Sequence, residues 1–335
     1  MQIGVLGAGA IGCYIGGSLQ RAGHAVTLIG RPRVLDPIRE HGLALRDLDG
    51  EVVRIAAETL RCAEDPRALA DCDLVLVACK GNDTERAARE LVPVLRPDGA
   101  VVSLQNGVDN PRVLASILGS ERVFGGIVSW NVVWQGGELA RMTSGPVIVE
   151  RRAGARGDAV ATMVKSLDRI GIKASDHPEI ERVLWSKLLF NLNNAINALL
   201  GITLAEELAD RRCRQLIATT MREGLAVMAR AGIRPLRLGR MSPELSVRVL
   251  PLPDAVFKML SRSMLKVGSD ARSSMYADLA LGKATEIEFL NGAVVRLGKE
   301  HDVPTPVNQR IVDEIKRAER LGKGSPRLSV AELGG

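Results

Sequence analysis

Residues 2–12 read QIGVLGAGAIG, and this short stretch decides the fold of the N-terminal half of the chain. The apolar run Gln2–Leu6 predicts a β-strand, and residues 11–21 have the spacing of a helix. Between them lies a G-x-G-x-x-G loop, Gly7-Ala8-Gly9-Ala10-Ile11-Gly12. The first glycine permits the turn, the second lets a pyrophosphate approach the backbone, and the third lets the helix pack closely. Because a helix N-terminus also offers amide donors to phosphates, the stretch predicts a dinucleotide site.

The residues that follow alternate between short apolar runs and helical patterns, which is typical of a parallel sheet covered by helices. Residues 43–45 and 52–55 flank the turn dipeptide Asp49-Gly50 and predict a hairpin, and residues 128–149 are rich in strand patterns. The other predicted elements are strands at Ala25–Ile29, Leu74–Ala78, Ala100–Leu104, Arg122–Gly126 and near Ile172, with helices at Asp83–Leu95 and Asp158–Ile170.

After residue 177 the strand patterns end and long helical periods take over. We therefore predict an α/β protein with an N-terminal Rossmann-type dinucleotide-binding domain over residues 1–177. An all-helical domain follows over residues 178–325, and residues 326–335 are expected to be a loose tail. The predicted helices of the second domain are Glu181–Leu200, Glu206–Ala231, Asp254–Lys266, Glu286–Glu300 and Asn308–Leu321.

The composition argues against a nucleic-acid partner. Aromatic residues make up only 3% of the chain, so base-stacking surfaces are hard to build. The net charge is +6, with 35 Arg and 10 Lys, yet no five-residue run is basic. We interpret the charge as diffuse surface arginine, which makes each of the few lysines a residue to consider individually.

The sequence carries no signal for secretion or membrane insertion. Met1 leads almost directly into a strand, and the densest apolar stretches, such as residues 74–79, are far shorter than a bilayer span. The five cysteines are odd in number and include no C-x-x-C pair, so neither a disulfide framework nor a zinc site is indicated. We expect a cytoplasmic protein with no membrane attachment and no bound metal.

The residues after the second predicted strand bear on the choice of cofactor. Gly30-Arg31-Pro32-Arg33 stands where an NAD-binding domain usually has an Asp or Glu for the 2′-hydroxyl of the adenosine ribose. A carboxylate would repel a 2′-phosphate, whereas the Arg31 guanidinium can bind one through two hydrogen bonds. The alternative is that Arg31 is one more surface arginine. We predict NADPH rather than NADH.

Two further polar segments follow strands of the predicted sheet. Lys80 ends the apolar run 74–79, and Gln105-Asn106-Gly107 follows the next strand. Ligands of open parallel sheets bind outside the carboxyl ends of the strands, so Lys80 and Asn106 are expected beside the cofactor. The Asn106 carboxamide can both donate and accept, which suits a ribose or a substrate oxygen. Each residue alone would be read as a solvated loop residue.

A lysine opens the helical half of the chain. Lys187 and Asn191 are four residues apart in the apolar segment 185–191, so they share one face of a helix. Reduction of a ketone creates an alkoxide that must be protonated, and an ammonium group is a suitable general acid. Burial and nearby positive charge would lower the pKa of Lys187 and make it a better donor. The alternative is a lysine with a buried stem and a solvated ammonium group.

With these residues in hand, the chain resembles the ketopantoate reductase (2-dehydropantoate 2-reductase) family. Two C-terminal segments strengthen the resemblance, Ser273-Ser274-Met275 and the run from Thr285 to Gly292, TEIEFLNG. The resemblance covers residues 2–322. No single motif is specific to the family, but their order and spacing are. It implies NADPH-dependent reduction of a 2-oxo acid, ketopantoate to pantoate, in pantothenate and coenzyme A biosynthesis.

The resemblance also implies roles for individual residues. Lys187 matches the family's catalytic proton donor, which also contacts the substrate, and Asn191 matches a substrate contact. Asn106 would touch both cofactor and substrate, and Lys80 would lie near the cofactor. These roles come from the family pattern and not from the spacing of the residues.

The C-terminal matches add two residues and one departure. Ser274 would contact the substrate, and Glu286 would help to hold the cofactor and form part of the catalytic site. The family usually has a second asparagine eight residues after the lysine, where this chain has Ala195. A helical offset would let Asn194 substitute. This departure leaves the identity of the 2-oxo acid open.

Three alternatives stand beside this interpretation. The chain could reduce another 2-oxo acid, or it could be a β-hydroxyacid dehydrogenase, because those enzymes also present a Lys-x-x-x-Asn pair after a dinucleotide fold. A non-catalytic NADPH-binding sensor is the third, and it leaves Lys187 unexplained. The sequence does not fix the oligomeric state, and a homodimer is one of the options.

Overall fold

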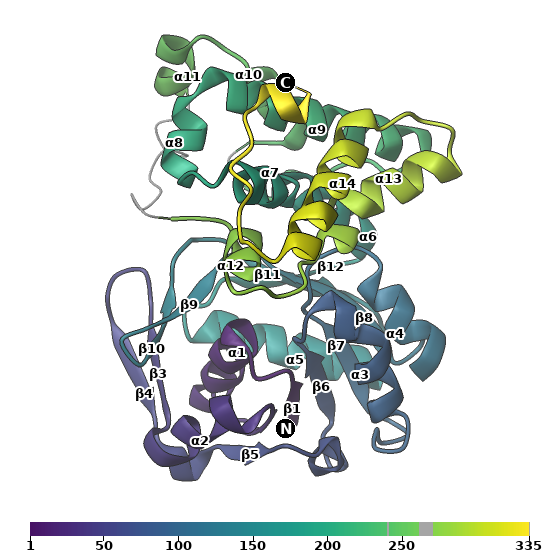
Figure 1. Cartoon of the computed structure of the whole chain (residues 1–335). Coiled ribbons are helices and arrows are strands. Elements are labelled where there is room, and N and C mark those ends of the chain that lie inside the picture. Colours follow the sequence, from purple (N-terminus) through teal and green to yellow (C-terminus); the bar gives the residue numbers. More distant parts are fainter. Residues whose placement is uncertain (240, 261–270, 335) are drawn as a thin grey trace. The chain divides into compact units, whose positions relative to one another are not determined.

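The computed structural model describes residues 1–239, 241–260 and 271–334 (Figure 1). The chain divides into two compact units, Met1–Leu184 and Trp185–Gly335. The division falls inside helix α6 (Ile180–Asn191), somewhat later than the boundary expected at residue 177. No helix among the described residues combines the length and the apolar character that a bilayer span requires.

The first unit is organised around an eight-stranded sheet with the order β12-β11-β8-β7-β6-β1-β2-β5. The strands at its centre run parallel, and only β11 lies antiparallel to its neighbour β8. The strands are β1 (Gln2–Leu6), β2 (Ala25–Ile29), β5 (Arg61–Ala63), β6 (Leu74–Val77), β7 (Ala100–Ser103), β8 (Val123–Val128), β11 (Val147–Glu150) and β12 (Ala174–His177).

Helices cover both faces of this sheet, and the alternation of side chains along β6 shows how. Leu74 and Leu76 point into one core with residues of α1 (Ala10–Arg21) and α5 (Ala155–Arg169). Val75 and Val77 point into the opposite core with residues of α3 (Thr84–Leu91) and α4 (Asn110–Leu118). A strand buried on both faces has to be continuously apolar, which is why the apolar run 74–79 could be predicted as a strand from the sequence.

A second, four-stranded sheet has the order β4-β3-β10-β9. The hairpin predicted around Asp49-Gly50 is present, with β3 (Leu43–Arg46) antiparallel to β4 (Val52–Ile55). β10 (Glu138–Arg141) then pairs in parallel with β3 and antiparallel with β9 (Val132–Gln135). This sheet was not expected, because the pairing of β3 with β10 joins segments far apart in the sequence.

Helices joined by loops make up the second unit, and its described residues include no strand, as expected. The long helix α9 packs against α10, α13 and α14, and α12 packs against α7. The helices are α6, α7 (Asn193–Leu200), α8 (Leu204–Ala209), α9 (Arg211–Arg230), α10 (Pro243–Val249), α11 (Asp254–Leu260), α12 (Ser274–Ala280), α13 (Asn291–Glu300) and α14 (Pro306–Leu321). The predicted fold class, a Rossmann-type domain followed by a helical one, is confirmed.

Several predicted helices are interrupted in the structure. The helix expected over residues 206–231 breaks at Asp210, whose backbone is extended and whose carboxylate accepts from the Arg212 amide at 2.8 Å to begin α9. The helix expected over residues 181–200 breaks at Leu192, between α6 and α7. Hydrophobic periodicity continues across such breaks, so it does not reveal a single capping residue.

Three further boundaries differ from the sequence expectation. The helix predicted over residues 83–95 ends at Leu91. The one predicted over residues 286–300 is a 3₁₀ turn at Ile287–Phe289 followed by α13. α11 ends at Leu260, and residues 261–266 of the helix expected there lie outside the described residues.

The C-terminal residues pack against the second unit instead of forming the loose tail we expected. The Leu328 amide donates to the Leu199 carbonyl oxygen at 3.0 Å, and the Leu333 side chain is fully buried beside the short turn Ala331–Leu333. The expectation rested on the terminal position of the segment, and the buried leucine and the backbone hydrogen bond hold it against the helices.

Candidate functional site

The glycine loop follows β1 and leads directly into α1, with Gly9 as the N-cap residue just before the helix. Gly7 has φ +113°, a conformation that favours glycine, and a Cβ on Gly12 would lie 2.2 Å from the Gly7 carbonyl oxygen. A Cβ on Gly9 would meet no atom within 4 Å, so this glycine is not required by packing. The open space above Gly9 and the unblocked helix N-terminus fit the phosphates of a dinucleotide.

Arg31 lies beside this loop at the same edge of the sheet. The amides of Gly7 and Ala8 donate to the carbonyl oxygen of Ile29, the last residue of β2, at 3.0 and 2.9 Å. Two residues later, Arg31 precedes the first residue of α2 (Pro32–His41), and its side chain is exposed. A guanidinium group at this position is available to an anion bound next to the glycine loop.

The segments that carry Lys80 and Asn106 are tied together by the buried side chain of Gln105. Its Nε2 donates to the Lys80 carbonyl oxygen at 3.4 Å and to the Thr84 hydroxyl at 2.7 Å. Its Oε1 accepts from the Ser103 hydroxyl at 3.1 Å. Because β6 and β7 are parallel neighbours, the residues that follow them lie at one edge. Both predicted residues are half-buried there.

Two polar residues that the sequence analysis did not single out hold Asn106 in place. Asn110 is fully buried, and its Nδ2 donates to the Asn106 carbonyl oxygen at 2.6 Å. The Thr84 hydroxyl, also buried, is 2.7 Å from the Asn110 Oδ1. Buried polar groups are normally satisfied by such bonds. The sequence signal was weak, because Asn and Thr near helix starts are common.

In the second unit, Lys187 and Asn191 lie one turn apart on α6, as the spacing predicted. The preceding residue, Ser186, is fully buried and accepts the Leu236 amide at 2.7 Å, which fixes this turn of the helix. Burial lowers the pKa of Lys187 to about 8, and the Glu286 carboxylate acts in the opposite direction by favouring the ammonium form.

Glu286 is held close to the start of a 3₁₀ turn rather than within a helix. The Thr285 amide donates to the Glu319 carboxylate at 2.7 Å, and the Thr285 hydroxyl accepts the Ile287 amide at 3.2 Å. These bonds fix the backbone on both sides of Glu286, whose charge acts on Lys187. The structure therefore brings Glu286 and Lys187 together, although residue types and spacing alone did not connect them.

Ser274 and Asn194 occur where α12 meets α7. Ser274 is exposed and is the first residue of α12. The preceding Ser273 is buried, and its hydroxyl donates to the Asn194 carbonyl oxygen at 2.8 Å. Ala195 is fully buried, so the position at which the family usually has an asparagine faces the interior of this unit.

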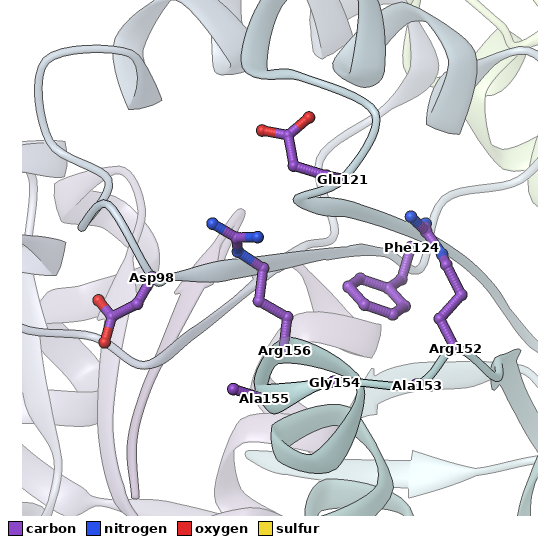
Figure 2. A pocket seen from close by; sticks show the side chains of 8 residues that line it. All are labelled: Asp98, Glu121, Phe124, Arg152, Ala153, Gly154, Ala155 and Arg156. Atoms are coloured by element: carbon purple, nitrogen blue, oxygen red, sulfur yellow. The ribbon is translucent and has the colours of Figure 1, made fainter.

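A hollow of about 440 Å³ lies in the first unit away from these residues. Figure 2 shows Phe124 and the arginines 152 and 156 among its lining residues, near the amino ends of β7 and β8. Arg156 donates to the carbonyl oxygens of Gly99 and Pro97, at 3.2 and 2.7 Å, and Arg152 stacks on Phe124 at 4.1 Å. These contacts are structural, and the hollow is at the edge opposite to the glycine loop.

The predicted site residues thus form one group in each unit. At the carboxyl edge of the sheet are the loop 7–12, Arg31, Lys80 and Asn106. In the helical unit, the Glu286 carboxylate interacts electrostatically with Lys187, which shares a helix face with Asn191. Ser274 follows Ser273 in the chain, and the Asn194 carbonyl oxygen accepts the hydrogen bond of the Ser273 hydroxyl. Among the residues with described coordinates, no three His, Cys, Asp or Glu side chains gather as metal ligands would.

A Rossmann-type domain with an open glycine loop, followed by a helical unit that holds a lysine of lowered pKa, is typical of dinucleotide-dependent oxidoreductases. Comparison with known protein families also indicates an oxidoreductase of this kind. The profile "Ketopantoate reductase PanE/ApbA" matches residues 3–154, and its C-terminal counterpart matches residues 179–319. The chain belongs to the ketopantoate reductase family. It is an oxidoreductase.

Individual relatives span nearly the whole chain. A 2-dehydropantoate 2-reductase of Halobacterium salinarum is 31% identical over 96% of this chain and all of its own length. The crystal structure of a PanE/ApbA family ketopantoate reductase from Ralstonia eutropha JMP134 is 28% identical, with a TM-score of 0.81 over 96% of this chain and 100% of its own. D-mandelate dehydrogenase with NADH and anilino(oxo)acetate shares the fold, at 23% identity and a TM-score of 0.80 over 96% and 99% of the two chains.

The glycine loop yields the first prediction. Gly9→Ala adds a methyl group where the structure has open space, so its free energy of unfolding should change by less than about 1 kcal/mol. The same methyl group would occupy the phosphate space, so the affinity for the dinucleotide should fall roughly tenfold or more. Urea unfolding and a fluorescence titration with the cofactor measure the two effects.

Gly12→Ala is the matched comparison, because its Cβ would overlap the Gly7 carbonyl oxygen. This variant should lose about 2 kcal/mol of unfolding free energy as well as cofactor affinity. A Gly9→Ala protein that bound the dinucleotide as tightly as the parent would contradict the assignment of the loop.

Proposed function

We propose that the chain catalyses the NADPH-dependent reduction of a 2-oxo acid, ketopantoate to pantoate, in pantothenate and coenzyme A biosynthesis. The observation that carries the proposal is Lys187, a lysine held in an apolar helix beside Glu286 with its pKa lowered to about 8. The family and the names of its relatives support the substrate. A cytoplasmic location and a homodimer remain expectations of the same interpretation.

Lys187 is proposed as the proton donor. When bound, the reduced nicotinamide would supply a hydride to the ketone carbon. The resulting charge on the oxygen must be neutralised by one proton, which the Lys187 ammonium group would donate and then regain from solvent. A pKa near 8 keeps the group mostly protonated at neutral pH and makes it a better donor than an ordinary lysine. Glu286 would keep the proton in place until the oxygen takes it.

The first unit is proposed to bind NADPH. The Gly7–Gly12 loop would hold the pyrophosphate, and Arg31 would bind the 2′-phosphate. The choice of NADPH over NADH is supported by the exposed guanidinium group of Arg31. It stands where NAD-binding domains usually have a carboxylate that binds the 2′-hydroxyl of the adenosine ribose. Lys80 and Asn106 would lie along the cofactor, and Asn106 would also contact the substrate.

The substrate contacts proposed in the helical unit are Asn191, Asn194 and Ser274. Asn191 is on the same face of α6 as Lys187, which supports a contact near the reacting carbonyl. Ser274 is exposed at the start of α12, where its hydroxyl can donate to a carboxylate. Ala195 is buried and offers no polar group, so Asn194 is proposed in place of the missing asparagine.

The decisive experiment is steady-state oxidation of NADPH with a small panel of 2-oxo acids that includes ketopantoate. We expect turnover, with the highest kcat/KM for ketopantoate. The reverse assay, 3-hydroxy acids with NADP⁺, distinguishes a β-hydroxyacid dehydrogenase. Tight NADPH binding without turnover of any 2-oxo acid would favour a cofactor sensor and overturn the proposal.

Arg31→Ala should lower the affinity for NADPH roughly 10- to 100-fold, because a charge-assisted hydrogen bond contributes about 1.5–3 kcal/mol. The affinity for NADH should change little, since it has no 2′-phosphate. Arg33→Ala is the control, because Arg33 is also exposed and lies two residues further along α2. Comparable kcat/KM values for NADPH and NADH in the parent, or unchanged NADPH binding in Arg31→Ala, would contradict the prediction.

Lys187→Ala should lower kcat about 10²- to 10⁴-fold while NADPH still binds. In the parent, kcat/KM for reduction should be constant at lower pH and fall as the pH rises through about 8, because only the protonated lysine donates. Stopped-flow or steady-state rates across pH 6–10 measure this (roughly two units either side of the pKa). A nearly normal kcat in Lys187→Ala, or a rate that increases above the pKa, would refute the role.

A further inference from the structure

Glu207 on α8 is a buried carboxyl group that the proposed chemistry does not use. Its side chain is 0% exposed, whereas the adjacent Glu206 is exposed. Its Oε2 accepts from the Nδ2 atoms of Asn193 and Asn197, each at 3.1 Å. Burial raises the pKa of Glu207 to about 7, while these two hydrogen bonds act to lower it. A buried carboxyl group is unfavourable for stability, so its presence calls for a compensating role.

The side chain that Glu207 orients is Asn197, which is also fully buried. The Asn197 Nδ2 donates to Glu207 and to the Ile202 carbonyl oxygen at 3.1 Å. Its Oδ1 accepts from the Ser273 amide at 2.8 Å. The two ends of a carboxamide have nearly the same shape, so partners decide its orientation. Two acceptors on one side hold the NH₂ group there and leave the oxygen facing Ser273.

Ser273, whose amide binds the oriented Asn197 oxygen, is in turn hydrogen-bonded to both α12 and α7. Its hydroxyl accepts from the Tyr276 amide at 3.1 Å and so caps α12. The same hydroxyl donates to the Asn194 carbonyl oxygen at 2.8 Å. A line of hydrogen bonds therefore runs from Glu207 through Asn197 to the residue that precedes Ser274. It joins α8 and α7, which are neighbours in the sequence, to the start of α12, which is 76 residues beyond Asn197.

We propose that Glu207 is a positioning residue of the substrate site. By fixing the Asn197 carboxamide it sets the start of α12 against α7, and with it the exposed Ser274 and the Asn194 backbone. The 2-oxo acid is contacted by these residues under the proposed function, on which this inference rests. Glu207 itself touches neither substrate nor cofactor.

Three variants test the role by steady-state kinetics. Glu207→Leu replaces the carboxyl group by an apolar side chain of similar size and removes the acceptor for Asn193 and Asn197. KM for the 2-oxo acid should therefore increase at least tenfold (about 1.4 kcal/mol), while the Kd for NADPH stays within about twofold. Glu207→Gln retains one acceptor oxygen and should stay within about threefold of the parent KM. Glu206→Gln is the matched control at the exposed neighbour and should leave KM unchanged.

Hydrogen exchange of the cofactor-free protein gives a readout that does not depend on activity. In Glu207→Leu, the amides of residues 273–276 should exchange faster, whereas those of α14 should not. If Glu207→Leu does not fold, Glu207→Asp takes its place, because a carboxylate shorter by one methylene group cannot reach both asparagines. It should change KM and exchange in the same direction.

Unchanged KM together with unchanged exchange at residues 273–276 would overturn the proposal. So would a loss of NADPH affinity equal to the loss of 2-oxo acid affinity, or Glu207→Gln behaving like Glu207→Leu, because each indicates a merely structural carboxyl group. If the parent reduces no 2-oxo acid, the proposed function fails on its own, and the exchange experiment still decides whether Glu207 positions α12.

Discussion

The carbonyl oxygen of Ile29 accepts the amides of Gly7 and Ala8, and much of the first unit depends on this pair of hydrogen bonds. They hold the loop after β1 against the end of β2, so that the glycine loop and Arg31 share one edge of the sheet. The turn is possible because Gly7 adopts φ +113° and because Gly12 leaves room for the Gly7 carbonyl oxygen. Parallel pairing of β1 with β6, and of β6 with β7, then brings Lys80 and Asn106 to the same edge.

The helical unit shows the opposite situation, in which the side chain proposed as proton donor, Lys187, weakens the fold. The pKa of Lys187 is lower in the folded chain than in an unfolded one, so the folded state disfavours the ammonium form. The resulting loss of stability is fully present below pH about 8 and diminishes as the pH rises towards the ordinary pKa of lysine. Glu286 offsets part of it. Such a site persists because the surrounding helices are stabilised elsewhere, for example by Arg214, which is buried and donates to four backbone carbonyl oxygens.

Both groups of predicted site residues rest on buried polar side chains that are not themselves predicted to bind a ligand. Gln105, Thr84 and Asn110 fix the Asn106 segment, and Asn197 and Glu207 fix the start of α12. Periodicity does not reveal such residues, because a buried Asn or Glu reads locally as an ordinary surface residue of a helix. Their burial is favourable because each has hydrogen-bond partners, some of them on other elements, such as Ser273 for Asn197 and Thr84 for Gln105.

The sequence by itself determined the elements whose cause is local. The glycine loop, the fully apolar β6, the hairpin at Asp49-Gly50 and the four-residue spacing of Lys187 and Asn191 follow from backbone sterics and from the periods of strands and helices. The tertiary structure decided what depends on long-range contacts. These are the pairing of β3 with β10, the breaks at Asp210 and Leu192, the packing of Leu333, and the electrostatic interaction of Glu286 with Lys187. A local pattern fixes which face of an element is apolar, whereas the partner of that face is chosen by the whole chain.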